Sequence, residues 1–272
     1  MSDLGAEDLE AEALRLVESM GRPVRRVRPR LARGLREGED LEVGTPAGGV
    51  MAWRIGQGPA TLMVHGWEDD NALWSPLIDA MTENLRACVA FDLPGHGWSP
   101  AETCSIADAG QAALAVAEAF GPIDSIVGHS FGCPSAIWAL AHGLEVQRAV
   151  MIASPVPRSQ ARSGWNLDDW KSHQISQGED PAVVERAMAI IAERPPRNDR
   201  DYDVEAVLPT MTAKALIVHS MDDDACPFAN SQRMAELWPG AELVALDGLG
   251  HRLVAQDDDV VARIAEFVEG FG

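Results

Sequence analysis

A Gly-His-Ser-Phe-Gly pentapeptide at residues 128–132 lies between a short strand-like run and a segment with small residues at helical spacing. The strand-like run, 123–127, predicts a strand, and 133–141 predicts a helix. A strand, Gly-x-Ser-x-Gly and a helix in this order are typical of a sharp turn that exposes a serine hydroxyl at the top of a parallel sheet. Glycines suit this turn because its backbone is strained and a neighbouring strand passes close by. The pattern predicts an α/β fold with a candidate nucleophile at Ser130.

The flanking sequence alternates between strand and helix patterns. A hairpin of two strands is expected at 41–43 and 50–55, and further strands at 60–64, 87–91, 149–153, 215–219 and 242–246. Helices are expected at 6–19, 72–85, 105–120, 181–193, 229–238 and 260–268. Alternation of this kind implies right-handed crossovers and a mostly parallel sheet with helices on both faces.

The alternation stops between residues 154 and 211, where turns, tryptophans and one clear helix replace the apolar strand runs. An insertion at this point should lie over the carboxyl edge of the sheet, where sites in such folds are found. We therefore expect a core made of 41–153 and 212–272, a helical cap at 154–211, and an N-terminal extension at 1–40 that contains a helix and an arginine-rich segment.

The chain is strongly acidic, with 272 residues and a formal net charge of −20. Long-range repulsion disfavours nucleic acid and anionic membrane surfaces as partners, so a small molecule is expected instead. The arginine-rich segment 22–36 should dock on the protein's own negative surface or remain solvated. A partner-binding arm or a homodimer contact is the alternative for that segment.

Four scattered cysteines, without a Cys-x-x-Cys pair or metal-ligand spacing, predict free thiols in a reducing compartment and no bound metal. The first residues lack the basic end and apolar stretch of a signal peptide. No apolar run reaches the length of a bilayer. We expect a cytoplasmic protein.

A serine hydroxyl needs a base before it can act as a nucleophile. In chains with this kind of turn, the order is serine, then an acidic residue, then histidine. His251 is the histidine that lies far enough along the chain, in a glycine-rich loop directly after the last expected strand. Three consecutive aspartates, 222–224, follow the strand at 215–219. Asp223 is the expected third member because the turn at 220–222 should bring it to the end of the strand, and Asp222 is the second choice.

An ester-type reaction also needs backbone N–H donors aimed at the developing oxyanion. The N–H of Phe131, at the start of the serine helix, is one candidate. The N–H of Trp67, in the loop after the third strand, is the other. Gly66 lets this loop approach closely.

Five motifs carry a family resemblance. They are His-Gly-Trp at 65–67, Asp-x-Pro-Gly-His-Gly-x-Ser at 92–99, Gly-His-Ser-x-Gly at 128–132, Ser-x-Asp-Asp-x-x-Cys-Pro at 220–227 and Gly-x-Gly-His-Arg at 248–252. Together they resemble the α/β-hydrolase fold superfamily, in register from residue 41 to 270. The resemblance implies an eight-stranded, mostly parallel sheet, a helical cap after the sixth strand, and a triad of Ser130, Asp223 and His251. It also supports Trp67 and Phe131 as oxyanion donors.

The expected function is that of a serine hydrolase that cleaves a small or medium apolar carboxylic ester without a cofactor. The same triad acting on a thioester, an amide, a lactone or the carbon–carbon bond of a β-diketone is the first alternative. A ligand-binding protein that retains the fold is the second. Eight tryptophans against one tyrosine favour an aromatic, apolar substrate pocket. Its expected members are Trp67, Phe131, Trp98, Trp165 and Trp170.

Overall fold

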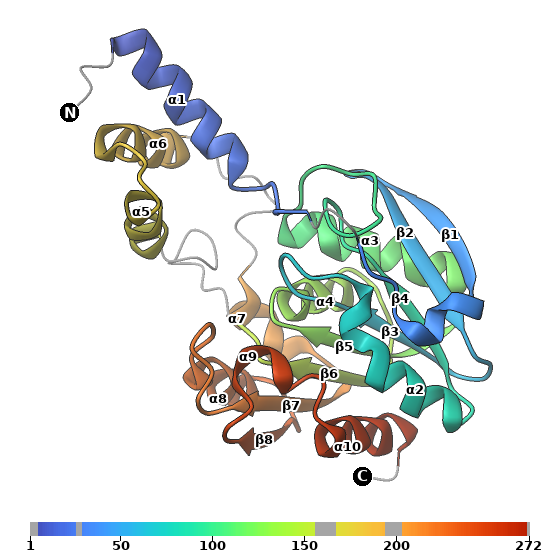
Figure 1. The fold of residues 1–272 in the computed structure, drawn as a ribbon. Helices are drawn as coiled ribbons and strands as arrows, with labels where there is room; N and C mark the ends of the chain where they lie inside the picture. Colours follow the sequence, from blue (N-terminus) through green and yellow to red (C-terminus); the bar gives the residue numbers. More distant parts are fainter. Residues whose placement is uncertain (1–4, 26–28, 156–166, 194–202, 271–272) are drawn as a thin grey trace.

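A single eight-stranded sheet forms the centre of the molecule (Figure 1). The structure is a computed structural model, and it describes residues 5–25, 29–155, 167–193 and 203–270. The strands lie in the order β1-β2-β4-β3-β5-β6-β7-β8. β2 is antiparallel to its neighbours β1 and β4, and all other neighbouring pairs are parallel. The strands are β1 (Glu39–Thr45), β2 (Gly48–Ile55), β3 (Ala60–Val64), β4 (Ala87–Phe91), β5 (Ile123–His129), β6 (Arg148–Ile152), β7 (Lys214–Ser220) and β8 (Glu242–Leu246).

Helices cover both faces of the sheet. α3, α4 and α8 pack on one face, and α2 and α10 pack on the other. The helices are α1 (Ala6–Ser19), α2 (Ser75–Glu83), α3 (Ile106–Phe120), α4 (Gly132–Ala141), α5 (Leu167–Ser176), α6 (Pro181–Glu193), α7 (Val204–Val207), α8 (Phe228–Leu237), α9 (Gly250–Leu253) and α10 (Asp258–Glu269), with 3₁₀ turns at Arg33–Glu37, Asn71–Trp74 and Leu208–Thr210. The predicted mostly parallel, doubly covered α/β sheet is confirmed.

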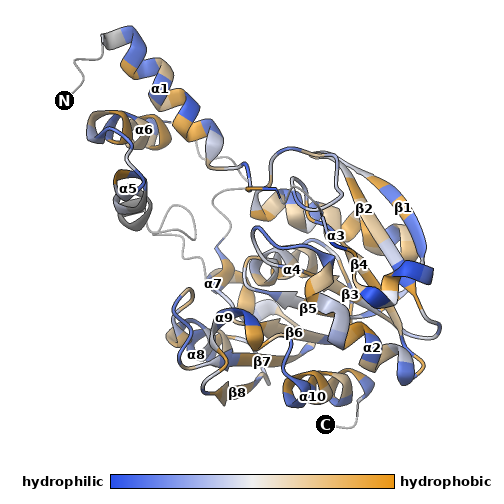
Figure 2. Cartoon of the chain, viewed as in Figure 1, coloured by the Kyte–Doolittle hydropathy of each residue, from blue (hydrophilic) through white to orange (hydrophobic). Residues whose placement is uncertain are grey.

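β3 and β4 are buried at every position and largely apolar because both of their faces are covered. Leu62 of β3 packs into the core that contains α3 and α4, and its neighbour Met63 packs into the core that contains α2 and α10. Both side chains are fully buried. Figure 2 shows hydrophobic residues along these strands and hydrophilic residues on the outward faces of the helices. Continuous apolar runs of this kind are the sequence signature of a buried parallel sheet.

The segment between β6 and β7 contains α5 and α6, which Figure 1 shows grouped with the N-terminal helix α1 and standing away from the sheet. α1 and α6 share an apolar cluster that includes Leu16 and Val184. Arg186 of α6 also donates two hydrogen bonds to the carboxylate of Glu10, at 2.6 and 3.0 Å. The N-terminal helix is therefore part of the same helical group as the segment expected to form a cap. The cap role itself stays a prediction.

The arginine-rich segment runs from α1 back to the body of the protein. Arg22 pairs with Glu102 at 3.2 Å, Arg30 with Asp70 at 3.1 Å and Arg33 with Asp79 at 3.0 Å. Arg25 Nε donates to the carbonyl of Gly95 at 3.2 Å. These arginines thus dock on the chain's own surface, as expected from its charge.

Three short or polar helices were not expected from the sequence. α5 begins among polar residues of the tryptophan-containing insertion, where no apolar face repeats at helical spacing. α7 and α9 are single turns of four residues, too short to produce a periodic pattern. The expected helix at 72–85 is a 3₁₀ turn followed by α2, because Pro76 begins a new helical segment at its first turn.

Candidate active site

Ser130 lies on the sharp turn between β5 and α4. Its backbone φ angle is 52°, a left-handed conformation that is uncommon for a residue with a side chain. Two hydrogen bonds hold the turn, from Ser130 N to the carbonyl of Ile152 at 2.9 Å and from Cys133 N to the carbonyl of Ser130 at 2.8 Å. A strained conformation that the surroundings impose in this way is common at functional sites.

Two glycines make the turn possible. A Cβ on Gly132 would lie 2.1 Å from the carbonyl oxygen of Val64, on the adjacent strand β3. A Cβ on Gly66 would lie 3.1 Å from the Cβ of Ser130. A side chain at Gly132 would therefore collide with β3, and one at Gly66 would crowd Ser130, so the two glycines let the loop after β3 pass directly beside the serine.

His251 and Asp223 continue from Ser130 in a chain of hydrogen bonds. The Oγ of Ser130 lies 2.9 Å from Nε2 of His251. Nδ1 of His251 lies 2.7 Å from Oδ2 of Asp223. A carboxylate can only accept here, so Nδ1 carries the proton, and Nε2 is left free to accept the proton of the serine hydroxyl. The three side chains named from sequence order meet at the carboxyl ends of β5, β7 and β8.

The geometry assigns different contacts to Asp223, the first choice from the sequence, and Asp222, the second choice. Asp223 accepts hydrogen bonds through Oδ1 from the backbone N–H groups of Ala225 and Cys226, at 2.9 and 2.8 Å, and directs Oδ2 at His251. Asp222 instead accepts from the backbone N–H groups of Gly248 and Gly250, at 3.0 and 3.2 Å. Asp222 therefore holds the loop on which His251 lies but does not contact its imidazole ring.

The backbone N–H groups of Trp67 and Phe131 lie on the two loops that flank Ser130. Among the described residues, neither group donates to a protein acceptor. The two side chains also touch, with their ring centroids 5.2 Å apart. Two unused donors beside a nucleophile are what an oxyanion site needs.

Two buried side chains fix the loop after β3. Nδ1 of His65 donates to the carbonyl of Gly66 at 2.8 Å, and its Nε2 accepts from the N–H of Leu93 at 3.0 Å. Asp92 accepts from the N–H groups of Asn71 and Trp98, both at 2.8 Å. These residues shape the turns of the site and do not contact Ser130.

Two further histidines contact the triad, and sequence reasoning did not assign them a role. Nε2 of His129 donates to the backbone carbonyl of His251 at 2.9 Å, while burial lowers the pKa of His129 to about 4. His219 lies 3.1 Å from Oδ2 of Asp223 through its Nε2 and 2.6 Å from Ser231 Oγ through its Nδ1. Burial also lowers the pKa of His219. Both rings are therefore neutral at pH 7. The sequence signal that could have identified them is their position, because His129 directly precedes Ser130 and His219 lies at the end of β7.

A cavity of about 90 Å³ opens beside Ser130, and it is lined by Gly66, Trp67, Asp69, His129, Ser130, His251 and Arg252. Sequence analysis missed Asp69 and Arg252, which form an ion pair at its wall. The lining is more polar than the expected aromatic pocket. Of the expected aromatic residues, Trp67 lines this cavity and Phe131 packs against Trp67.

The other expected aromatic residues lie elsewhere. Trp98 is 52% exposed and does not line the cavity. Trp165 lies outside the described residues, as does the side chain of Trp170, whose backbone is in α5. The assignment of these three tryptophans to a substrate pocket stays a prediction.

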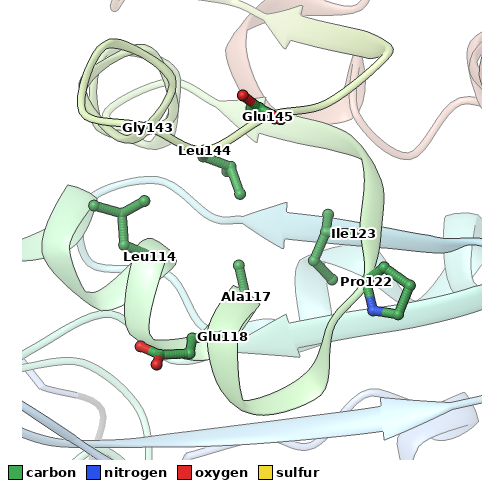
Figure 3. A pocket seen from close by; sticks show the side chains of 8 residues that line it. All are labelled: Leu114, Ala117, Glu118, Pro122, Ile123, Gly143, Leu144 and Glu145. Carbon is green, nitrogen blue, oxygen red and sulfur yellow. The ribbon is translucent and has the colours of Figure 1, made fainter.

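A larger hollow of about 400 Å³ lies at the opposite end of β5, between the end of α3 and the turn after α4 (Figure 3). The eight side chains around it are mainly apolar, with Glu118 and Glu145 as the charged members. None of the eight is a serine, cysteine or histidine. The size of this hollow does not by itself indicate a reaction, so the smaller cavity beside Ser130 is the candidate active site.

The described residues also bear on metals and membranes. No cluster of three or more histidine, cysteine or carboxylate side chains among them has the geometry to hold a metal ion. Within the same residues, every helix is too short or too polar to cross a bilayer. All four cysteines are buried and free.

A strained serine between a strand and a helix, with a histidine and an aspartate supplied by the last two strands of a mostly parallel sheet, defines a nucleophile-elbow hydrolase. A model of the alpha/beta hydrolase family matches residues 61–264. The chain therefore belongs to the α/β-hydrolase family, and the expectation that it is an enzyme of this class is confirmed.

Curated relatives carry a more specific name. Over 229 residues the chain is 26% identical to the pimeloyl-acyl-carrier-protein methyl ester esterase of Nitrosomonas europaea, an alignment that covers 72% of this chain and 90% of the relative. Over 171 residues it is 32% identical to the enzyme of the same name from Vibrio cholerae, covering 58% of this chain and 64% of the relative.

Solved structures of esterases share the fold. An esterase from Exiguobacterium antarcticum superposes with a TM-score of 0.68 at 19% identity, covering 85% of this chain and all of that one (100%). The carboxylesterase CesB from Bacillus subtilis superposes with a TM-score of 0.65 at 18% identity, covering 96% of this chain and 99% of that one.

Proposed function

We propose that this chain hydrolyses small to medium, largely apolar carboxylic esters through an acyl-enzyme on Ser130. The observation that carries the proposal is the continuous path from Ser130 Oγ to His251 Nε2 at 2.9 Å and from His251 Nδ1 to Asp223 at 2.7 Å. The names of the curated relatives support an ester as the substrate and a methyl ester as the first one to try.

The reaction begins when His251 Nε2 takes the hydroxyl proton of Ser130 and Oγ attacks the ester carbonyl. The resulting oxyanion accepts hydrogen bonds from the N–H groups of Trp67 and Phe131. Asp223 keeps the proton of His251 on Nδ1 and stabilises the imidazolium that forms. His251 then gives its proton to the departing alcohol, which leaves the acyl group on Ser130. A water molecule, deprotonated by the same imidazole, releases the acid and restores the hydroxyl.

Ser130→Ala tests this proposal with a p-nitrophenyl ester series of increasing acyl length. The variant should retain the wild-type melting temperature and lose turnover by about 10³-fold or more, because the nucleophile is absent. Retained turnover in the folded variant would contradict an acyl-enzyme on Ser130.

A second function on the same triad is cleavage of a thioester, an amide, a lactone or a β-diketone. Asp69 and Arg252 make one wall of the cavity polar, which favours testing substrates other than apolar esters. A matched ester, thioester, amide and diketone should be compared by kcat/KM. The ester should be fastest, and a higher kcat/KM for another bond would assign that bond instead. Ligand-dependent stabilisation without turnover would favour a binding protein.

A further inference from the structure

A buried carboxylate joins two loops of the candidate active site. Asp69 lies two residues after Trp67, and its side chain is only 5% exposed. Arg252, which follows His251 directly, donates from Nη1 to Oδ2 of Asp69. The other oxygen of Asp69 accepts the backbone N–H of Asp70 at 2.9 Å and lies 3.4 Å from Nη2 of Arg30. One carboxylate thus contacts the Trp67 turn, the His251 loop and the N-terminal arginine segment.

Other contacts also hold the His251 loop: Asp222 accepts from the N–H groups of Gly248 and Gly250, and His129 donates to the carbonyl of His251. Gly248 and Gly250 both have positive φ angles, 81° and 57°, and a Cβ on either would meet no atom within 4 Å. Leu253, at the end of this loop's single helical turn, is 60% exposed. A loop built from left-handed glycines in open space needs side-chain contacts to fix its position. The guanidinium of Arg252 supplies such a contact one residue away from the catalytic imidazole.

The ion pair is charged at neutral pH. Burial is the largest single influence and raises the pKa of Asp69, but Arg252 and the other neighbouring groups together outweigh it and hold this pKa below its ordinary value. Removing either partner of such a pair leaves the other charge partly buried and unpaired, so the two loops are expected to move.

We propose that Asp69 is a positioning residue, whose ion pair with Arg252 holds the Trp67 turn against the His251 loop, so that the oxyanion donor faces the ester carbonyl oxygen while the general base faces Ser130 Oγ. Arg30 extends this link to the N-terminal segment. The inference rests on the proposed function, because it assigns a purpose to the spacing between Trp67 and His251. It predicts an effect on kcat, since a base and an oxyanion donor that are misplaced by a fraction of an ångström still bind substrate but react slowly.

The test compares Asp69→Asn, Arg252→Gln and the double variant, using steady-state hydrolysis of one p-nitrophenyl ester. Each single variant should lower kcat by about 10- to 100-fold with KM changed by less than about twofold. The double variant should be no slower than the worse single variant, because the two changes break one interaction. Arg252→Lys, which keeps the charge but not the planar fork, should recover part of the loss.

Asp79→Asn is the matched control. Asp79 pairs with Arg33 of the same arginine-rich segment at 3.0 Å, but it lies on α2 and is half-exposed. This variant should retain wild-type kcat. Circular dichroism and melting temperature establish that each variant is folded. If Asp69→Asn does not fold, the half-exposed Arg252 decides the question through its Gln and Lys variants.

The two proposals fail in different ways. A wild-type protein that turns over no ester in the panel would refute the proposed function. The positioning role alone would be refuted if the wild type is active and the folded Asp69→Asn and Arg252→Gln variants keep kcat within twofold. It would also be refuted if the losses of kcat in the two single variants multiply in the double variant.

Discussion

Nε2 of His219 lies 3.1 Å from Oδ2 of Asp223, the same oxygen that binds His251. The carbonyl of Cys226 lies 3.0 Å from Nε2 of His219 and can only accept, so the proton of this ring is on Nε2 and is donated to that carbonyl. Ser231 then donates to Nδ1 at 2.6 Å and keeps the proton on Nε2. Asp223 therefore lies between two imidazoles, one that faces Ser130 and one that faces the core.

His219→Leu removes the imidazole that lies beside Oδ2 of Asp223, so this oxygen should be held less firmly against His251 and kcat should fall by about 3- to 10-fold. His219→Gln, which keeps a polar group at this position, should lose less activity. Steady-state hydrolysis of one p-nitrophenyl ester measures the effect, and the melting temperature establishes that each variant is folded. An unchanged kcat in a folded His219→Leu variant would show that this histidine does not act on Asp223.

Asp223 and Asp222 should differ sharply in kinetics although they are adjacent. Asp223→Asn removes the acceptor that sets the tautomer of His251, so kcat should fall by about 10⁴-fold. Asp222→Asn weakens the hydrogen bonds from Gly248 and Gly250 and should lower kcat by less than about tenfold. Equal losses, measured side by side at pH 8, would contradict the roles that the geometry assigns to the two carboxylates.

Buried neutral histidines should make stability fall in acid. Burial lowers the pKa of His96 from 6.5 to about 3 and that of His129 from 6.5 to about 4. Below pH 6.5 the unfolded chain takes up protons at these positions and the folded chain does not, so the free energy of unfolding should decrease as pH falls from 6.5 toward 3. Each such group contributes a slope of at most about 1.4 kcal/mol per pH unit.

Urea unfolding at pH 7, 6, 5 and 4 measures this dependence. His96→Asn should have a shallower dependence on pH than the wild type, because one of the protons no longer binds preferentially to the unfolded chain. The matched control is His142→Asn at an exposed position, which should keep the wild-type slope. Identical slopes in His96→Asn and the wild type would show that His96 is not the buried neutral group described above.

Much of this architecture could be predicted from the sequence because its signals are local. The strand 87–91 is a continuous apolar run, the strand 60–64 is nearly so, and the turn at Ser130 has glycines where side chains would collide. Chain order then selected His251, and the length of the turn after β7 selected Asp223 over Asp222. Each of these inferences needs only a short stretch of chain and the rule for where parallel strands end.

The rest depends on contacts between distant loops. Asp69 and Arg252 are 183 positions apart and meet only because two loops end at the same edge of the sheet. α1 likewise packs on α6, which lies far along the chain from it, and no periodic pattern in the sequence specifies such a contact. The number of tryptophans favoured an aromatic pocket, but the number of a residue type does not determine where its side chains point. Trp98 is exposed, and the charged residues Asp69 and Arg252 line the cavity.

Labelling with a fluorophosphonate probe, followed by intact mass and peptide mapping, tests the central claim that Ser130 is a nucleophile activated by His251. The account predicts one adduct per chain, located on the peptide that contains Ser130. It should be absent from Ser130→Ala and from His251→Ala, while both variants keep the wild-type melting temperature. No adduct on folded wild-type protein, or an adduct that persists in folded Ser130→Ala, would contradict it.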